Sequence, residues 1–201
     1  MRTSLPSTFC VFILTHGRPD GVITARSLER CGYTGNWVLV IDNEDATAPL
    51  YRAKYGDERV VIFDKQAEAD RCDEGNNFDD RRTPLMARNA CFEIATRLGV
   101  SHFWVLDDDY YFFGTRDESG ARAMTDMDAA LSALLRFYCS ADITSIAFAQ
   151  GGDHIGGFKG VKLTRKCMNS FLCSTGRPFR FVGALNDDVN TYTTLGSRGA
   201  L

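Results

Sequence analysis

Three adjacent carboxylates, Asp107, Asp108 and Asp109, stand in "FWVLDDDYYFF" between apolar and aromatic flanks. Neighbouring carboxylates repel one another unless one takes up a proton or a cation lies among them. The flanks predict a strand that crosses a core and brings its acidic end to a ligand site. Within the triplet, Asp107-x-Asp109 is a DxD pattern, which suits a divalent cation bridging a nucleotide diphosphate.

Two alternatives for the triplet are a solvated acidic turn and a phosphotransferase of the haloacid dehalogenase type. A turn is disfavoured because the preceding segment is strongly apolar and the usual turn residues Gly, Asn and Pro are absent. The phosphotransferase places its Asp nucleophile after the first strand and follows it with Thr or Val. Here the triplet follows the fourth predicted strand and precedes Tyr110 and Tyr111.

A cationic stretch occupies the interval 154–186, which contains no Asp or Glu. In a protein of net charge -3, this segregation predicts a contact with a polyanion such as DNA, with a solvated basic face as the alternative. The adjoining segment "AQGGDHIGGFKG" is rich in glycine and could cradle a donor sugar or a flipped acceptor base, or simply be a flexible connection. The candidate acceptor residues are Gly151, Gly152, Lys159, Lys162, Arg165 and Lys166.

Strands and helices alternate in the pattern of the sequence. This alternation predicts an α/β fold with a mostly parallel central sheet flanked by helices, and a ligand site at the carboxyl ends of the strands. The charged segment 66–82 is expected to be a long loop that orders on ligand binding. The expected strands are 9–15, 37–42, 59–64, 102–107 and 143–149, and the expected helices are 21–32, 48–56, 83–99 and 125–140.

Four predicted strands end next to polar or acidic groups, and parallel strands bring such ends to one edge. The composition is that of one globular domain, 1–201. Seven cysteines without zinc spacing favour a reducing cytoplasm, and "FCVFIL" is too short for a membrane span. The strand ends are Thr15-His16-Gly17-Arg18, Asp42-Asn43, Asp64-Lys65 and Asp107-Asp108-Asp109.

The stretch "RTPLMARNACFEIATRLGVSHFWVLDDD" resembles the core of the GT-A glycosyltransferases, in which a helix bearing Arg-Asn runs into a strand ending in DxD. The segments "FILTHGRPD", "FAQGGDHIGG" and "KCMNSF…FVGALNDDVNTY" are similar to the TET-associated glycosyltransferases, which occur in bacteriophages. The resemblance implies a Rossmann-like GT-A fold, with a nucleotide-sugar-binding half at 1–109 and an acceptor-side half at 110–201. It also implies transfer of a sugar, from a UDP-sugar, to 5-hydroxymethylcytosine in DNA, in the cytoplasm of an infected host cell if the protein is phage-encoded.

The resemblance implies roles for individual donor-side residues. Asp42 would accept from uracil or ribose, Arg88 would face the diphosphate, and Asn89 would fix a loop. Asp109 would ligate Mn²⁺ or Mg²⁺, together with Asp107 unless that carboxylate binds the ribose. The remaining donor-binding candidates are Thr15, His16, Arg18 and Asp108.

A second acidic pair, Asp187-Asp188 in "GALNDDVNTY", aligns with the late acidic pair that supplies the general base in inverting GT-A enzymes. Asp188 is the first candidate and Asp187 the second, while the start of a helix explains the same residues equally well. The chain ends soon afterwards without the late His ligand of many relatives, so either it is a fragment or that ligand comes from elsewhere. The sequence leaves open the sugar, the anomeric outcome and the oligomeric state.

The alternatives are a GT-A enzyme acting on a glycan or small molecule, and a GT-A-like module that binds nucleotide or DNA without turnover. A sugar-1-phosphate nucleotidyltransferase is disfavoured, because "THGRPDG" lacks the Gly-rich signature of that class.

Overall fold

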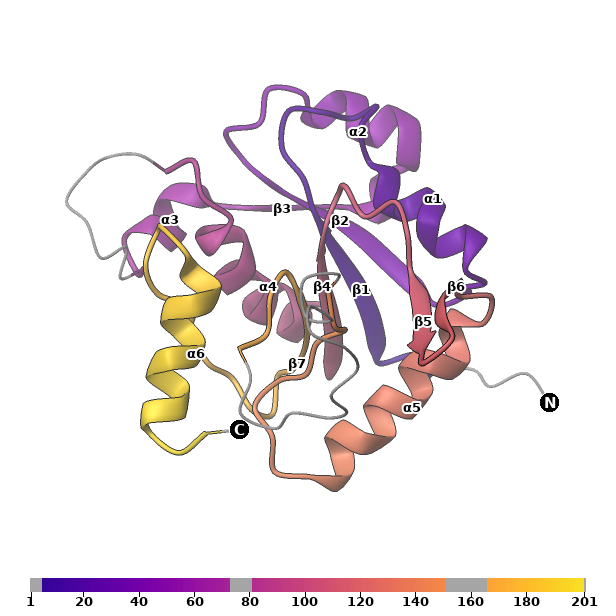
Figure 1. Cartoon of the computed structure of the whole chain (residues 1–201). Helices are drawn as coiled ribbons and strands as arrows, with labels where there is room; N and C mark the ends of the chain where they lie inside the picture. Colours follow the sequence, from indigo (N-terminus) through magenta and orange to yellow (C-terminus); the bar gives the residue numbers. More distant parts are fainter. Residues whose placement is uncertain (1–4, 73–80, 151–165, 201) are drawn as a thin grey trace.

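The computed structural model describes residues 5–72, 81–150 and 166–200 (Figure 1). Within these ranges the chain alternates strands and helices before ending on a helix. In chain order the elements are β1 Phe9–Leu14, α1 Ile23–Arg30, β2 Asn36–Asp42, α2 Ala48–Tyr55, the 3-10 turn η1 Asp57–Arg59, β3 Val60–Phe63, α3 Lys65–Ala69, α4 Leu85–Arg97, β4 His102–Asp107, β5 Gly114–Asp117, β6 Gly120–Ala123, α5 Met127–Ser140, β7 Ser170–Ser174 and α6 Asp187–Ser197.

The central sheet has five strands in the order β3-β2-β1-β4-β7. All neighbouring pairs are parallel except β4 and β7, which are antiparallel. Leu14 at the end of β1 is paired with both Val40 and Asp107, so β1, β2 and β4 end at nearly the same level. The mostly parallel α/β sheet predicted from the sequence is confirmed, and its carboxyl edge gathers the expected polar ends.

Two apolar clusters cover the two faces of the sheet. Alternate residues of β1 point to opposite sides, with Phe9, Val11 and Ile13 in one cluster and Phe12 and Leu14 in the other. The first cluster packs against α1, α2 and α5, and the second packs against α4 (Figure 1). Because both faces are covered, the strands are apolar along their whole length, as in other parallel sheets.

The expected elements agree closely with the structure in the first two thirds of the chain. Four strands and all four helices lie within a few residues of their predicted bounds. The segment 66–82 is not a loop throughout, because α3 begins in front of it with Asp64 as its cap, whose side chain accepts from the Ala67 amide at 2.9 Å. The part of this segment at 73–80 lies outside the described residues.

The prediction of a strand at 143–149 was wrong. Only Ile146 forms a bridge, to Leu172, whereas β7 occupies the place beside β4 and completes the sheet. The short strand β7, the β5–β6 hairpin and α6 were not among the predicted elements. No helix in the described ranges is both long enough and apolar enough to cross a bilayer.

Candidate functional site

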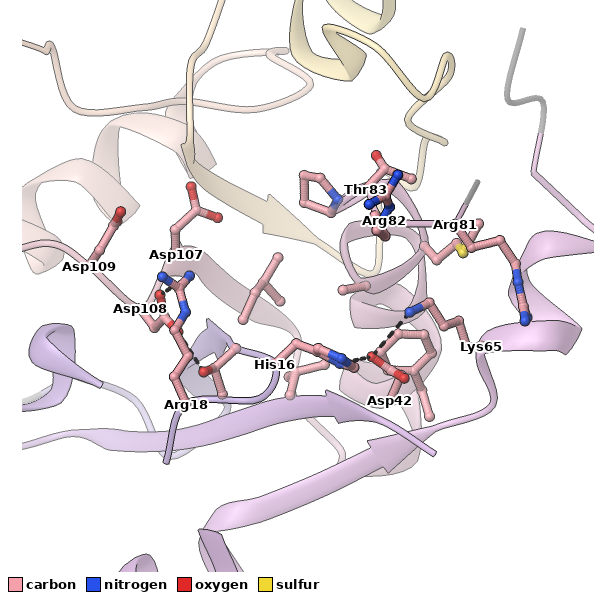
Figure 2. Close-up of a pocket in the computed structure, with 17 residues that line it drawn as sticks. His16, Arg18, Asp42, Lys65, Arg81, Arg82, Thr83, Asp107, Asp108 and Asp109 are labelled. Atoms are coloured by element: carbon pink, nitrogen blue, oxygen red, sulfur yellow. Dashed lines mark hydrogen bonds and ion pairs between the residues drawn. The ribbon is translucent and has the colours of Figure 1, made fainter. Parts of the chain in front are cut away.

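A pocket of about 450 Å³ lies at the carboxyl edge of the sheet, where β1, β2, β3 and β4 end and α4 begins (Figure 2). One end of it is acidic and the other is cationic. Thr15, His16, Arg18, Asp42 and the Asp107–Asp109 triplet, all predicted donor-side residues, line it. Its other lining residues are Leu14, Val40, Phe63, Lys65, Arg81, Arg82, Thr83, Pro84, Met86 and Ala87.

The three carboxylates of the triplet have different surroundings. Asp108 is buried, accepts a 2.5 Å hydrogen bond from the Thr15 hydroxyl and pairs with Arg18 Nη2 at 2.8 Å. Asp107 is partly buried and Asp109 is exposed. In Figure 2 the carboxylates of Asp107 and Asp109 point away from the Arg18 guanidinium, which meets Asp108. Asp108 therefore links the segment after β4 to the segment after β1. Asp107 and Asp109 are the carboxylates of the triplet that are available to a ligand.

The environment of Asp107 favours a nearby cation. Burial raises the pKa of this carboxyl to about 6, Arg88 opposes the rise, and the neighbouring Asp109 adds to it. A divalent ion beside Asp107 would stabilise its charged form. In the described part of the chain, no group of three or more His, Cys, Asp and Glu side chains is arranged to hold a metal. The donor set thus fits Mg²⁺ or Mn²⁺ held by two carboxylates together with phosphate oxygens and water, and does not fit a metal held by the protein alone.

A hydrogen-bonded pair, His16 and Asp42, lies at the centre of the pocket (Figure 2). Asp42 Oδ2 is 2.7 Å from His16 Nδ1 and 3.6 Å from Lys65 Nζ, and Asp42 Oδ1 accepts from the Glu44 amide at 3.1 Å. Both oxygens of the buried Asp42 therefore have partners within the protein. The His16 side chain is 55% exposed. This arrangement makes Asp42 a residue that orients His16, and its contact with uracil or ribose stays a prediction.

The loop that carries His16 is held by a second buried carboxylate, Asp45. Its Oδ2 accepts from the Gly17 amide at 2.8 Å and lies 3.9 Å from His16 Nδ1. Gly17 has a φ of +71°, which favours glycine at this turn. Sequence reasoning missed Asp45, although "DNEDAT" places it three residues after the end of a strand.

The cationic end of the pocket consists of Lys65, Arg81 and Arg82 (Figure 2). Arg81 pairs with Glu44 at 2.8 Å and donates to Gln66 at 2.9 Å, so it links the β2 loop to α3. Lys65 stands in the predicted strand end Asp64-Lys65. The two arginines were missed as site residues, although their position immediately before the "TPLMARN" helix was the available signal.

Arg88 and Asn89 do not line the pocket. Arg88 is only 2% exposed, and its Nη1 lies 2.7 Å from both carboxylate oxygens of Asp187. Its Nη2 donates to Asn169 at 3.0 Å and lies 3.8 Å from Asp107 Oδ1. The guanidinium that was expected to face a diphosphate is therefore paired with the carboxylate of Asp187. Of the carboxylates that line the pocket, Asp107 is the one to which this guanidinium lies close.

Asn89 fixes the backbone of Phe181. Its side chain donates to the Phe181 carbonyl at 3.1 Å and accepts from the Phe181 amide at 2.8 Å. This double contact is what the sequence led us to expect of a residue that fixes a loop. It holds the segment before α6 against α4.

Asp187 and Asp188 are buried residues at the start of α6. Asp187 is paired with Arg88, whereas Asp188 Oδ1 accepts from the Val189 amide at 2.7 Å. The interpretation as a helix start is confirmed, and it leaves open a role in catalysis. Thr83, which lines the pocket, donates to the Ala184 carbonyl at 3.0 Å and so brings the segment before α6 close to the pocket.

The predicted acceptor stretch lies mostly outside the described residues, and this holds for Gly151, Gly152, Lys159, Lys162 and Arg165. Lys166 is described and exposed.

Two further cations of the interval are bound within the protein. Arg177 donates to the carbonyls of Tyr138, Ala141 and Ile143, and Arg180 pairs with Glu68 at 3.0 Å. In the described part of the interval 154–186, Arg177 and Arg180 therefore stabilise the fold, whereas Lys166 exposes its charge to solvent.

The fold and the pocket together define an α/β protein with a polar ligand site at the carboxyl edge of a parallel sheet, the usual place for nucleotide ligands. The family model of the TET-associated glycosyltransferases matches residues 9–201. The chain belongs to this family and is a glycosyltransferase.

The crystal structure of 4-diphosphocytidyl-2C-methyl-D-erythritol synthase is similar over 96% of this chain and 86% of its own, with 14% identity and a TM-score of 0.45. No curated protein matches the chain.

Proposed function

We propose that the protein is a metal-dependent glycosyltransferase of the GT-A type. In this proposal it moves a hexose from a UDP-sugar to the hydroxymethyl group of 5-hydroxymethylcytosine in DNA. The observation that carries the proposal is the placement of Asp107 and Asp109 on one wall of the pocket, in a chain of a glycosyltransferase family. The DxD pattern and the resemblance of the "ARN" helix support the finer assignment.

The pocket offers complementary groups to a nucleoside diphosphate. Asp107 and Asp109 would hold the divalent cation, which when bound neutralises charge on the diphosphate leaving group. Lys65, Arg81 and Arg82 supply positive charge at the opposite end, where phosphate or carbonyl oxygens of the donor would be stabilised. His16, oriented by Asp42, presents its ring to the nucleotide between the two ends.

The proposed base is Asp188. In an inverting transfer, its carboxylate takes the proton of the acceptor hydroxyl while that oxygen forms a bond to the anomeric carbon. The bond from that carbon to the diphosphate oxygen breaks at the same time, and the diphosphate leaves with the electron pair. Asp187 is a poorer candidate, because its two oxygens are bound to Arg88.

The DNA acceptor is supported by the acid-free interval 154–186 and by the exposed Lys166 within it. Reaching a base in a duplex requires the target nucleotide to be extruded, which costs a few kcal/mol and is easier from a single strand. A single-stranded substrate should therefore react faster than a duplex.

The proposal is tested by incubating DNA that contains hydroxymethylcytosine with the protein, Mn²⁺ and a panel of nucleotide-sugars, followed by mass spectrometry of the nucleosides. The expected result is a hexose mass increment on hydroxymethylcytosine that is absent with EDTA. Transfer only to a glycan or a small molecule would replace the acceptor assignment. Binding of UDP without any transfer would favour the non-catalytic module.

A further inference from the structure

Two aromatic side chains directly after the acidic triplet face solvent. Tyr111 is 76% exposed and Phe112 is 49% exposed, while Tyr110 and Phe113 on either side turn inward. The rings of Tyr110 and Phe113 stack at 5.6 Å, and Phe113 packs against Trp104. Two adjacent large rings in solvent forgo the stabilisation that burial of their apolar area would give.

The backbone that carries these rings is held from both sides. The Tyr110 amide donates to Thr24 Oγ1 at 2.9 Å, and Arg30 donates to the Tyr111 carbonyl at 2.7 Å. The Tyr110 hydroxyl donates to the Asn169 carbonyl. Because the backbone of this segment is already held in place, binding of a ligand to the exposed rings costs less conformational entropy than ordering a mobile loop would.

The Phe112 ring lies against the start of the β5–β6 hairpin. A Cβ at Gly114 would lie 2.6 Å from a Phe112 ring carbon, so glycine there leaves room for the ring. Side chains alternate along a strand, so Arg116 stands on the same face of the hairpin as Gly114. Arg122, opposite Thr115, stands on the other face.

We propose that Tyr111, Phe112 and Arg116 form a stacking platform for an unpaired nucleobase of a single-stranded acceptor. The exposed rings match a base, on which they stack, and Arg116, on the hairpin face over which the Phe112 ring lies, matches the phosphate of the same nucleotide. Tyr111, the first residue of the platform, follows the proposed metal ligand Asp109 by two residues, so the platform begins where the chain leaves the donor pocket. The inference rests on the proposed function for the identity of the acceptor.

The test measures the binding of a fluorescein-labelled, single-stranded oligonucleotide containing one hydroxymethylcytosine, by anisotropy and without any nucleotide-sugar. The double variant Tyr111→Leu, Phe112→Leu keeps apolar side chains but removes the aromatic faces, and should weaken binding by about 5- to 150-fold. The double variant Tyr111→Phe, Phe112→Tyr keeps the rings and should bind within about twofold of the parent. Phe137→Leu, at an exposed ring on α5, is the matched control and should change nothing.

Charge is tested on the same hairpin. Arg116→Gln should lower the slope of log affinity against log salt by about one. Arg122→Gln should leave it unchanged, because this side chain lies on the opposite face and pairs with Asp117 at 3.8 Å. Circular dichroism and thermal melting of each variant verify that the fold is retained.

The platform is overturned if the leucine variant binds the oligonucleotide like the parent, if Phe137→Leu weakens binding equally, or if Arg116 and Arg122 behave alike. Binding of an uncharged maltooligosaccharide at these rings, in place of the oligonucleotide, would also overturn it. Calorimetry with UDP and Mn²⁺ reports on the donor site separately. If the platform test fails while UDP still binds with Mn²⁺, the platform proposal is wrong. If the platform test succeeds but UDP does not bind, the proposed donor site is wrong.

Discussion

Arg88 Nη1 lies 2.7 Å from both oxygens of Asp187, joining α4 to the start of α6 across 99 positions of sequence. Both side chains are buried, and the guanidinium also lies 3.8 Å from Asp107. This contact ties the proposed metal-binding end of β4 to the helix that carries the proposed base. It also distinguishes the two late acids. Asp187 is paired with Arg88 through both of its oxygens, whereas Asp188 accepts from the Val189 amide through Oδ1.

Arg88→Met should destabilise the fold by about 3–5 kcal/mol, because it leaves the buried Asp187 carboxylate without its partner. Asp187→Leu added to it should restore most of that loss, since two apolar groups then replace the buried ion pair. Urea unfolding of the parent, the single variant and the double variant measures the effect. A single variant as stable as the parent would show that the pair does not hold α6 in place.

Asp109→Asn should abolish Mn²⁺-dependent binding of UDP and leave the melting temperature unchanged, because it removes a charge at an exposed strand end and no core volume. Calorimetry with UDP, with and without Mn²⁺, measures this. Asp117→Asn, at an exposed position on the hairpin, is the matched control. Undiminished metal-dependent affinity in the Asp109 variant would defeat the metal assignment.

Asp188→Asn should lower turnover by roughly a hundredfold or more while UDP affinity is retained, because it removes the proposed proton acceptor and nothing in the donor pocket. Single-turnover kinetics on hydroxymethylcytosine DNA provide the rate. Asp187→Asn should instead reduce stability. If neither variant slows transfer, the acidic pair only begins a helix.

Asp42→Asn should weaken UDP binding about as much as His16→Ala does, and the double variant should be no worse than either single variant. The reason is that Asp42 acts through the His16 ring, to which it is bound at 2.7 Å. A double-mutant cycle by calorimetry tests the coupling. Additive losses would mean that Asp42 contacts the nucleotide itself, as the family resemblance implied.

The partly buried His102 should weaken the fold in acid. Burial, and then the charge of Arg177, lower the pKa of His102 below 6.5, so the folded state favours the neutral ring. The corresponding stability is present above pH 6.5 and is lost as the pH falls through the lower folded-state pKa. His102→Asn should therefore lose less stability than the parent between pH 7 and pH 5 in urea unfolding. An equal loss in both proteins would contradict this.

The α/β class, most of the first two thirds of the fold and the edge where the site lies could all be predicted from the amino-acid sequence. The reason is local: β-branched and aromatic runs such as "WVLVID" and amphipathic helices have periods that can be read along the chain. In a parallel sheet, polar residues at strand ends must share an edge, so Thr15, His16, Asp42 and the Asp107–Asp109 triplet were predicted together.

The contacts of each of these charged side chains could not be predicted from the sequence and depend on long-range packing. Asp107, Asp108 and Asp109 are chemically identical, and their different surroundings come from Thr15, Arg18 and Arg88, which are distant in sequence. Arg88 was expected at a diphosphate and is instead paired with Asp187.

The same holds for strand pairing. The segment 143–149 has the composition of a strand, but β7 occupies the edge of β4. The local sequence pattern indicates whether a segment prefers to be a strand. Which strand it pairs with, and which charges pair with one another, depend on long-range packing and on the need to compensate buried charges.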